Sequence, residues 1–173
     1  MIKIGHKAPD FTLTAYHGHN DEFKKVSLKD YQGKWVILFF YPRDFTFVCP
    51  TELHGFAKHE AEFEKEGAAI IAASTDSEHA HKAWFSKDLP DVKYPVLADT
   101  TLSMTRDYEV LIEETGEALR GTFIINPEGI VKYIVVSDNN VGRSVEETLR
   151  VLKALKTGKL CPVEWEEGEK TLN

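Results

Sequence analysis

Cysteine is scarce in this chain of 173 residues, which contains only Cys49 and Cys161. No Cys-x-x-Cys pair is present, and its absence argues against a zinc ribbon and against a thioredoxin-type dithiol. A chain of this length buries roughly 70% of its unfolded surface without cross-links. We therefore expect the two cysteines to be catalytic, redox-active or incidental, and not to form an ordinary structural disulfide.

Positive charge is also in short supply, with 21 lysines and arginines against 28 aspartates and glutamates and a net charge of −7. This balance disfavours a protein that follows nucleic-acid phosphates. No apolar window approaches the roughly 18 residues that a membrane span needs, and the first residues lack the apolar stretch of a signal peptide. We expect a cytoplasmic protein without nucleic-acid or membrane partners.

The seven histidines suggest no metal site. His79 and His81 stand two positions apart on an expected helix, so their rings point to different faces. His17 and His19 lie in a turn rich in Gly and Asn. We expect these four side chains on the surface, and we expect neither a metal nor a cofactor.

Alternating strand and helix patterns predict an α/β fold. Unbroken apolar runs at 35–41 and 68–74 are typical of strands buried on both faces. Helical patterns follow at 51–66 and 77–87, which predicts a right-handed β-α-β-α unit with parallel strands. The further expected elements are a strand at 95–98, a short helix at 101–108, a hairpin of strands 121–125 and 130–136, and a helix at 144–156.

This order of elements predicts a thioredoxin-like α/β fold with an N-terminal extension and a C-terminal arm. The extension is expected to contain a hairpin around Gly18-His19-Asn20. The polar residues after Gly158 lie outside the expected core. We therefore predict one domain over residues 1–158 and an arm over residues 159–173.

Cys49 stands between a buried strand and a helix, where α/β sheets commonly place their active sites. Pro50 fits the first helical position, so the sulfur would face the positive end of the helix dipole. The thiolate is the reactive form, and about 3% of an ordinary thiol is ionised at pH 7. To be mostly ionised at neutral pH, a thiol needs its thiolate form stabilised by roughly 3 kcal/mol. A helix start supplies roughly 2 kcal/mol at best, so a cation is also required. Judged by its position alone, Cys49 could equally be a small buried core residue without a chemical role.

Residues 40–53, which read FYPRDFTFVCPTEL, resemble the active-site segment of the peroxiredoxins. Pro42, Thr46 and Cys49 fill the family's Pro-x-x-x-Thr-x-x-Cys pattern. Later blocks resemble the family's in the same order, at 76–84, 94–99, 119–125 and 141–144. The similarity covers essentially the whole chain, and it is greatest to the typical two-cysteine class, of the bacterial alkyl hydroperoxide reductase C type.

The resemblance implies a thiol peroxidase that reduces hydrogen peroxide and small organic hydroperoxides. Cys49 would attack the terminal peroxide oxygen and become a sulfenic acid. Thr46 and backbone amides near Cys49 would hold the peroxide oxygens, and Arg120 would contact both thiolate and substrate. Pro42 would shield the site from water. Judged by its local sequence, Arg120 looks instead like a solvated arginine on a strand.

Cys161 resembles the resolving cysteine of the same class, although an incidental exposed cysteine fits its local sequence. By resemblance, the sulfenic acid would condense with Cys161 of the partner subunit into an intersubunit disulfide. Thioredoxin or a flavoprotein disulfide reductase would then reduce that disulfide. Glu52 resembles a supporting carboxylate that pairs with Arg143, and it fits equally well as an acidic residue in a helix's first turn.

The resemblance further implies dimers that associate into a decameric ring, with Ser77 and Trp84 near the ring-building interface. Trp84 fits an ordinary core position equally well. The stretch between Trp84 and Tyr94 lacks a Gly-Gly-Leu-Gly insertion, and the tail lacks a Tyr-Phe pair. Both absences predict resistance to overoxidation, because less structure would hold the Cys49 turn folded.

Two other classes of protein share features with this sequence. A redox-regulated holdase chaperone or a thiol-disulfide oxidoreductase would use the same fold, and the missing Cys-x-x-Cys argues against the oxidoreductase. A cysteine hydrolase would need a histidine base near Cys49. His54 is disfavoured as that base, because it lies five residues further along and no orienting carboxylate is evident.

Overall fold

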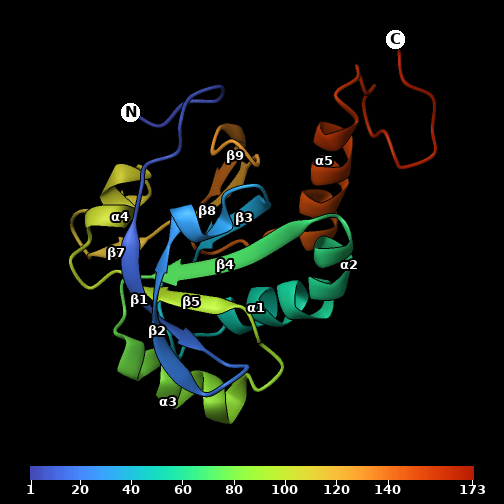
Figure 1. The fold of residues 1–173 in the computed structure, drawn as a ribbon. Helices are drawn as coiled ribbons and strands as arrows, with labels where there is room; N and C mark the ends of the chain where they lie inside the picture. The colour runs from blue at the N-terminus through green and yellow to red at the C-terminus, as the bar shows by residue number, and fades with distance from the viewer. The chain divides into compact units, whose positions relative to one another are not determined.

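The computed structural model describes residues 1–173, which divide into two units, residues 1–143 and residues 144–173 (Figure 1). The first unit contains β1 (Thr12–His17), β2 (Glu22–Ser27), the 3-10 helix η1 (Leu28–Tyr31), β3 (Trp35–Phe40), α1 (Cys49–Lys58), α2 (Glu60–Lys65), β4 (Ala68–Ser74), α3 (Glu78–Asp88), β5 (Pro95–Ala98), α4 (Ser103–Asp107), β6 (Leu111–Ile112), β7 (Glu117–Ala118), β8 (Arg120–Ile125) and β9 (Val131–Ser137). The second contains α5 (Val145–Thr157). The predicted division after residue 158 stays a prediction.

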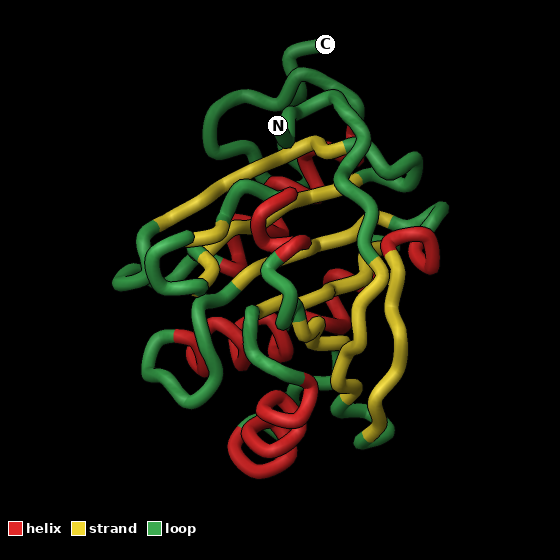
Figure 2. Tube along the Cα trace, turned by 90° about the vertical axis from the view of Figure 1, so that its left-hand side faces the viewer, coloured by secondary structure: helices red, strands yellow, loops and turns green.

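Seven strands of the first unit form one sheet in the order β2-β1-β5-β4-β3-β8-β9, and Figure 2 shows them running side by side. β3 pairs in parallel with β4, and β4 with β5, while β8 pairs antiparallel with both β3 and β9. The expected N-terminal hairpin is present as β1 and β2. The predicted α/β, thioredoxin-like class is confirmed. The carboxyl ends of the parallel strands meet at one edge, where the β3–α1 loop begins.

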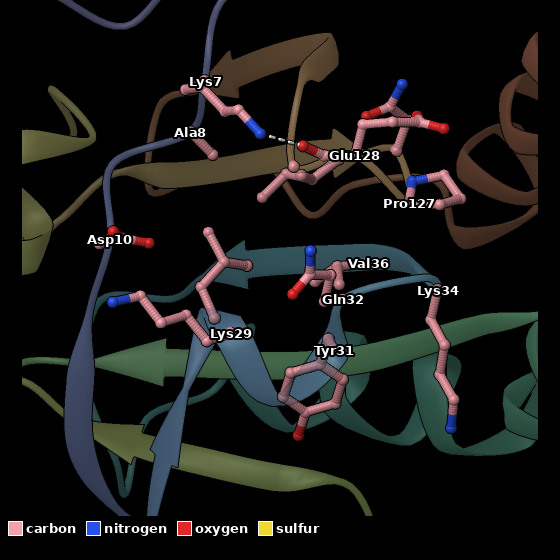
Figure 3. Close-up of a pocket in the computed structure, with 14 residues that line it drawn as sticks. Lys7, Ala8, Asp10, Lys29, Tyr31, Gln32, Lys34, Val36, Pro127 and Glu128 are labelled. Carbon is pink, nitrogen blue, oxygen red and sulfur yellow. Dashed lines mark hydrogen bonds between the residues drawn. The ribbon is translucent and has the colours of Figure 1, made fainter.

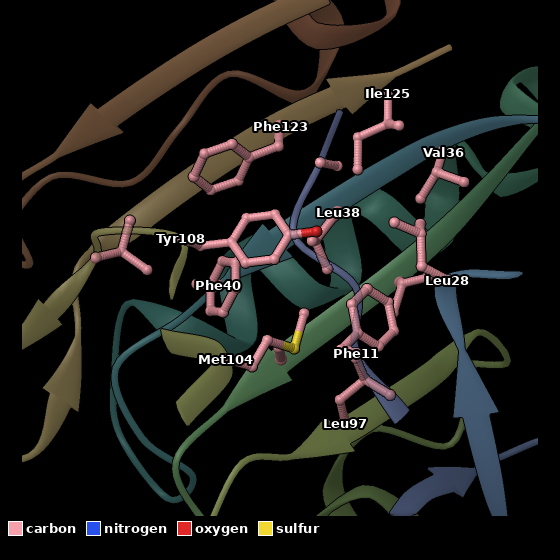
Figure 4. Close-up of a cluster of buried hydrophobic side chains, with 14 of the residues drawn as sticks. Phe11, Leu28, Val36, Leu38, Phe40, Leu97, Met104, Tyr108, Phe123 and Ile125 are labelled. Carbon is pink, nitrogen blue, oxygen red and sulfur yellow. The ribbon is translucent and has the colours of Figure 1, made fainter. Parts of the chain in front are cut away.

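Alternating residues of β3 belong to two cores because successive side chains of a strand point to opposite faces. Val36, Leu38 and Phe40 belong to a buried cluster with residues of the N-terminal segment, α4 and β8 (Figure 4). Phe39 points the other way and stacks on Phe56 of α1, with ring centroids 4.1 Å apart. This stacking fixes α1 against the sheet, with its first residue at the end of β3.

The continuous helix expected over 51–66 is wrong, because α1 ends at Lys58 and α2 begins at Glu60. His59, with φ −100° and ψ 5°, interrupts the helical hydrogen-bond ladder and donates its N–H to Phe56 O at 3.2 Å. Phe56 and Phe63 are both fully buried on either side of the break. Their spacing remains helical across it, so the apolar pattern gave no sign of the interruption. η1 and the two-residue strands β6 and β7 were also not expected, since such short elements carry no periodicity.

The second unit begins with the expected helix. The Ser144 side chain accepts a hydrogen bond from the Glu147 N–H (3.1 Å), and Gly158, at φ +65°, ends α5 in the left-handed conformation that glycine favours. The residues after α5 are bonded within the unit: Leu172 N–H donates to Leu160 O at 2.8 Å, and Arg150 donates to Trp165 O at 2.8 Å. No helix in the chain has the length and apolar character to cross a bilayer.

Candidate active site

Cys49 is the first residue of α1 and is completely buried. Val48 before it already has helical backbone angles (φ −78°, ψ −40°), and Pro50 follows within the first turn. The predicted place of Cys49 at a helix start is confirmed. Here the sulfur lies where the unpaired N–H groups of the helix concentrate positive potential.

Arg120, the first residue of β8, brings a guanidinium group to this sulfur. Its Nη1 lies 3.5 Å from Cys49 Sγ and 2.7 Å from Glu52 Oε2, and the side chain is 3% exposed. Nε and Nη2 donate to the main-chain carbonyl of Asn139 at 3.0 and 2.7 Å. The solvated orientation suggested by its local sequence is therefore wrong, and the guanidinium is fixed from both sides.

Glu52 lies one helical turn after Cys49 and joins the two arginines of the site. Arg143 donates to Glu52 with its Nε (2.8 Å), its Nη2 (2.7 Å) and its main-chain N–H (2.9 Å). Burial acts to raise the pKa of the Glu52 carboxyl, but the hydrogen bonds and charge of Arg143, with the charge of Arg120, hold that pKa below its ordinary value. The carboxylate is therefore ionised in the folded chain at neutral pH.

Arg143 is itself positioned by the sheet. Its Nη1 donates to the Gly121 carbonyl at 2.9 Å, and its guanidinium lies 5.1 Å from the ring centre of Phe39. Arg120 contacts the thiol, and Glu52 joins it to the second guanidinium, so the cluster beside Cys49 has a net positive charge. Such a charge attracts electron-rich and anionic groups.

Pro42 and Thr46 lie in the loop between β3 and α1. Pro42 is buried, whereas Thr46 is partly exposed. The Thr46 hydroxyl donates to the carbonyl of Arg43 at 3.0 Å. Phe45, which directly precedes Thr46, has φ +57°, a backbone conformation that residues with a Cβ rarely adopt. The loop is therefore held in a defined turn.

Cys161 lies in the second unit, where its sulfur is 3.4 Å from Thr157 Oγ1 and 3.8 Å from the carbonyl of Ala154. It is partly exposed, and both cysteines of the chain are free thiols. A partly exposed thiol is open to exchange with a disulfide or a sulfenic acid.

Two histidines differ from their sequence-based expectations. His81 was expected on the surface and is instead fully buried, with ring nitrogens facing Asp44 and the Leu97 carbonyl. A helical signal was available, because His81 shares one face of α3 with the buried Trp84 and Phe85. His54 does have a carboxylate partner, Asp91 at 2.7 Å, but the pair is exposed and bears no contact with Cys49.

A cavity of about 350 Å³ lies at the opposite end of β3 from the Cys49 loop (Figure 3). Val36 and Ile125 are among its apolar lining, and Lys7, which donates to the Glu128 carbonyl, lies at its rim. It contains no cysteine, so it is not part of the thiol site.

Comparisons with known proteins agree with this geometry. Residues 4–134 match the model of the AhpC/TSA family. The chain belongs to this family. A Bacillus subtilis protein that carries a peroxiredoxin name is 52% identical over 98% of this chain and 97% of its own length. A thioredoxin peroxidase of Echinococcus granulosus is 48% identical over 97% and 91% of the two chains.

Solved structures of peroxiredoxins share the fold. The reduced 2-Cys peroxiredoxin of Plasmodium vivax superposes with a TM-score of 0.93 at 34% identity, covering 97% of this chain and 91% of that one. AhpC of Enterococcus faecalis gives 0.88 at 41% identity, covering 94% and 100%. The predicted resemblance to the peroxiredoxins is confirmed, and membership places the chain among the peroxidases of the oxidoreductase class.

Proposed function

We propose that this peroxiredoxin reduces hydrogen peroxide and small organic hydroperoxides with Cys49 as the nucleophile. The observation that carries the proposal is the 3.5 Å contact between Arg120 Nη1 and Cys49 Sγ at the start of a helix. A helix start alone falls short of holding a thiolate, and a buried guanidinium supplies the missing stabilisation.

In the first step, the Cys49 thiolate attacks the terminal oxygen of ROOH. The S–O bond forms as the O–O bond breaks, the sulfur is oxidised to a sulfenic acid, and RO⁻ leaves and is protonated to ROH. Negative charge moves from sulfur to the departing oxygen, so donors aimed at that oxygen stabilise the transition state more than the ground state. We assign this task to Arg120 and to backbone amides near Cys49, and we place the Thr46 hydroxyl beside the peroxide oxygens.

The remaining residues support these groups. Glu52 orients Arg120 through the 2.7 Å contact, and Arg143 keeps Glu52 ionised. Pro42, buried beside the start of the loop, limits water at the sulfur. Limited water and a fixed guanidinium strengthen every electrostatic contact in the site.

In the second step, the Cys161 thiol attacks the sulfenic acid, an S–S bond forms and water leaves. We propose that this cysteine comes from the other subunit of a dimer. A dithiol of thioredoxin or of a flavoprotein disulfide reductase then reduces the disulfide and is itself oxidised. We propose a reducing, cytoplasmic location for this cycle, because such a compartment returns disulfides to thiols.

Self-association is supported by β9, an outer strand of the sheet. Val135 and Val136 are 38% and 43% exposed. Consecutive strand residues point to opposite faces, so both faces of this edge are open to a partner. We propose a homodimer, and dimers that assemble further into a ring with Ser77 and Trp84 near the second interface.

The test is peroxide consumption by wild type, Cys49→Ser and Cys161→Ser with a dithiol reductant, thioredoxin and a flavoprotein reductase in parallel. Cys49→Ser is expected to lose activity, and Cys161→Ser is expected to form sulfenic acid without the intersubunit disulfide on non-reducing gels. A Cys49→Ser variant as fast as wild type would remove the peroxidase proposal.

A further inference from the structure

The β3–α1 loop is fastened at Asp44, a buried residue that the proposed chemistry leaves unused. Its Oδ1 accepts a hydrogen bond from the Tyr41 hydroxyl at 2.6 Å, and its Oδ2 lies 2.7 Å from Nδ1 of His81 on α3. Its main-chain N–H donates to the carboxylate of Asp76, between β4 and α3, at 2.7 Å. One loop residue is thus bonded to the end of β3, to the β4–α3 turn and to α3.

The imidazole of His81 faces acceptors with both of its nitrogens. Nε2 is 3.1 Å from the Leu97 carbonyl, which accepts but cannot donate, so Nε2 carries a hydrogen. Nδ1 and Asp44 Oδ2, at 2.7 Å, also need a hydrogen between them. The His81–Asp44 pair therefore holds one proton more than a neutral imidazole beside an ionised carboxylate.

The surrounding charges fit a cation at His81. Asp76 is the second carboxyl of the cluster; burial raises its pKa, and the charge of His81 acts in the opposite direction. Tyr41 is neutral, since burial and then Asp44 raise the pKa of its hydroxyl well above the ordinary value. Arg43 is directed elsewhere, to Glu117 at 2.6 Å. An imidazolium at His81 offsets the charge of the buried Asp44 carboxylate with which it is paired.

Helix α3 touches the same loop at a second point. Phe45 packs against Trp84 with ring centroids 5.6 Å apart, and its positive φ persists only while the neighbouring residues are held. Thr46 follows directly, and its hydroxyl donates to the carbonyl of Arg43. The direction of the Thr46 hydroxyl therefore depends on the backbone on both sides of Asp44.

We propose that the protonated His81–Asp44 pair is a positioning device, which holds the loop so that Thr46 presents its hydroxyl to a peroxide at Cys49. Neither member touches the sulfur or the substrate, so both are positioning residues. The proposal rests on the peroxidase function proposed above. Loss of the pair relaxes the loop but leaves Arg120 and the helix start in place. It should therefore slow the reaction of Cys49 with peroxide more than it slows the alkylation of the Cys49 thiolate.

The kinetic test compares two rates at Cys49 in the full chain: oxidation by hydrogen peroxide in a stopped-flow instrument, and alkylation by iodoacetamide followed on the Cys49 peptide by mass spectrometry. His81→Phe and Asp44→Asn are expected to lower the first rate at least tenfold and the second less than twofold. His81→Gln keeps an amide donor for Asp44 and should recover part of the peroxide rate. The matched control is His79→Phe, two residues earlier on α3 with a side chain 78% exposed, which should change neither rate.

The protonation state is read directly from ¹⁵N spectra of the histidine rings in the wild-type chain at neutral pH. Both nitrogens of His81 are expected to carry hydrogen, and Asp44→Asn should remove the hydrogen from Nδ1. A His81 ring with one bare nitrogen in the wild type would overturn the shared-proton part of the proposal.

The two proposals fail separately. A wild-type chain that does not consume peroxide sinks the peroxidase function whatever the His81 spectrum shows. If the wild type does consume it, a His81→Phe variant with an unchanged peroxide rate, or with both rates lowered equally, would leave His81 no positioning role. Variants that are unfolded by circular dichroism would make the pair purely structural and would overturn the proposal as well.

Discussion

Arg120 and Cys49 are 71 positions apart in the sequence, yet Nη1 of the arginine lies 3.5 Å from the sulfur in a site that solvent does not reach. The same nitrogen contacts Glu52 at 2.7 Å, and the rest of the guanidinium is bonded to the carbonyl of Asn139. A cation held this firmly does not have to reorganise as charge moves from sulfur to oxygen, and reorganisation of the surroundings is a large part of the barrier in water.

Removal of this guanidinium is expected to slow Cys49 oxidation strongly. Arg120→Leu deletes both the charge beside the sulfur and a donor for the departing oxygen, so we expect a loss of about 10²–10³ in the rate with hydrogen peroxide. Stopped-flow oxidation measures it. Arg106→Leu is the control, because Arg106 forms an exposed ion pair with Glu113 and makes no hydrogen bond or ion pair with Cys49, Glu52 or Arg120. An Arg120→Leu rate within threefold of wild type would contradict the assignment.

Glu52 should make the stability of the chain depend on pH in the acid range. Because the folded pKa of its carboxyl is lowered, the unfolded chain binds this proton more readily, and the stabilisation is complete above the unfolded pKa of roughly 4.3. It is lost as the pH falls through the lower folded value. Glu52→Gln leaves Arg120 and Arg143 without their carboxylate and should cost about 3–5 kcal/mol of unfolding free energy at pH 7.

Urea denaturation at pH 7 and below pH 4 tests this pH dependence. The difference in the free energy of unfolding between wild type and Glu52→Gln should shrink in acid. Glu113→Gln serves as the control, since it removes an exposed partner of Arg106 and should change little at either pH. A difference that grows in acid would show that Glu52 is not held ionised by the arginines.

Gly121 is next to both arginines of the site. Arg120 precedes it in β8, and its carbonyl accepts a hydrogen bond from Arg143. A Cβ at this position would lie 2.7 Å from Val110 Cγ1 and 3.0 Å from Phe123 Cε2. Gly121→Ala should therefore shift the strand, cost about 1–3 kcal/mol of stability and slow peroxide reduction. Gly142→Ala is the matched control, since its nearest contact would be an ordinary 3.5 Å. Equal stability of the two variants in urea would refute the packing argument.

The place of Cys49 at a helix start could be predicted from local sequence, whereas the surroundings of its sulfur could not. A buried strand, a loop and a proline in the first helical turn point to Cys49 within about fifteen residues of chain. Arg120 depends on the pairing of β8 with β3, which no local pattern encodes, so the family resemblance was needed to select it. The break at His59 was hidden because apolar residues keep their helical spacing across it.

His81 shows where a local rule misled. Its spacing from His79 correctly separates the two rings, but the interpretation of both as surface residues ignored the face that His81 shares with Trp84 and Phe85. A histidine on the apolar face of a helix needs buried partners, and those come from Asp44 and Leu97, which lie far away in the sequence. Such a network follows from tertiary structure alone.

Cys161 should determine the fate of the oxidised enzyme. If its thiol captures the sulfenic acid before a second peroxide arrives, as proposed, wild-type activity should persist in excess hydrogen peroxide with a reductant present. Cys161→Ser should accumulate sulfinic acid on the Cys49 peptide, measured by mass spectrometry. Cys161→Ser treated with peroxide and an excess of a small thiol is the control, because that thiol can take the place of the missing one. Rapid loss of wild-type activity at modest peroxide would contradict the predicted resistance to overoxidation.

The edge of β9 should govern both self-association and disulfide formation. A lysine at Val136 places a charge on an open strand that is otherwise available for pairing, and charged edges are what natural proteins use to prevent such contacts. Val136→Lys is therefore expected to shift sedimentation velocity profiles toward the monomer. Val163→Lys, at a residue 89% exposed in the second unit, provides the control. Because Cys49 and Cys161 are proposed to react across the dimer, the edge variant should also lose the disulfide-linked band after peroxide. An edge variant that is monomeric and still forms its disulfide would show that the two cysteines meet within one chain.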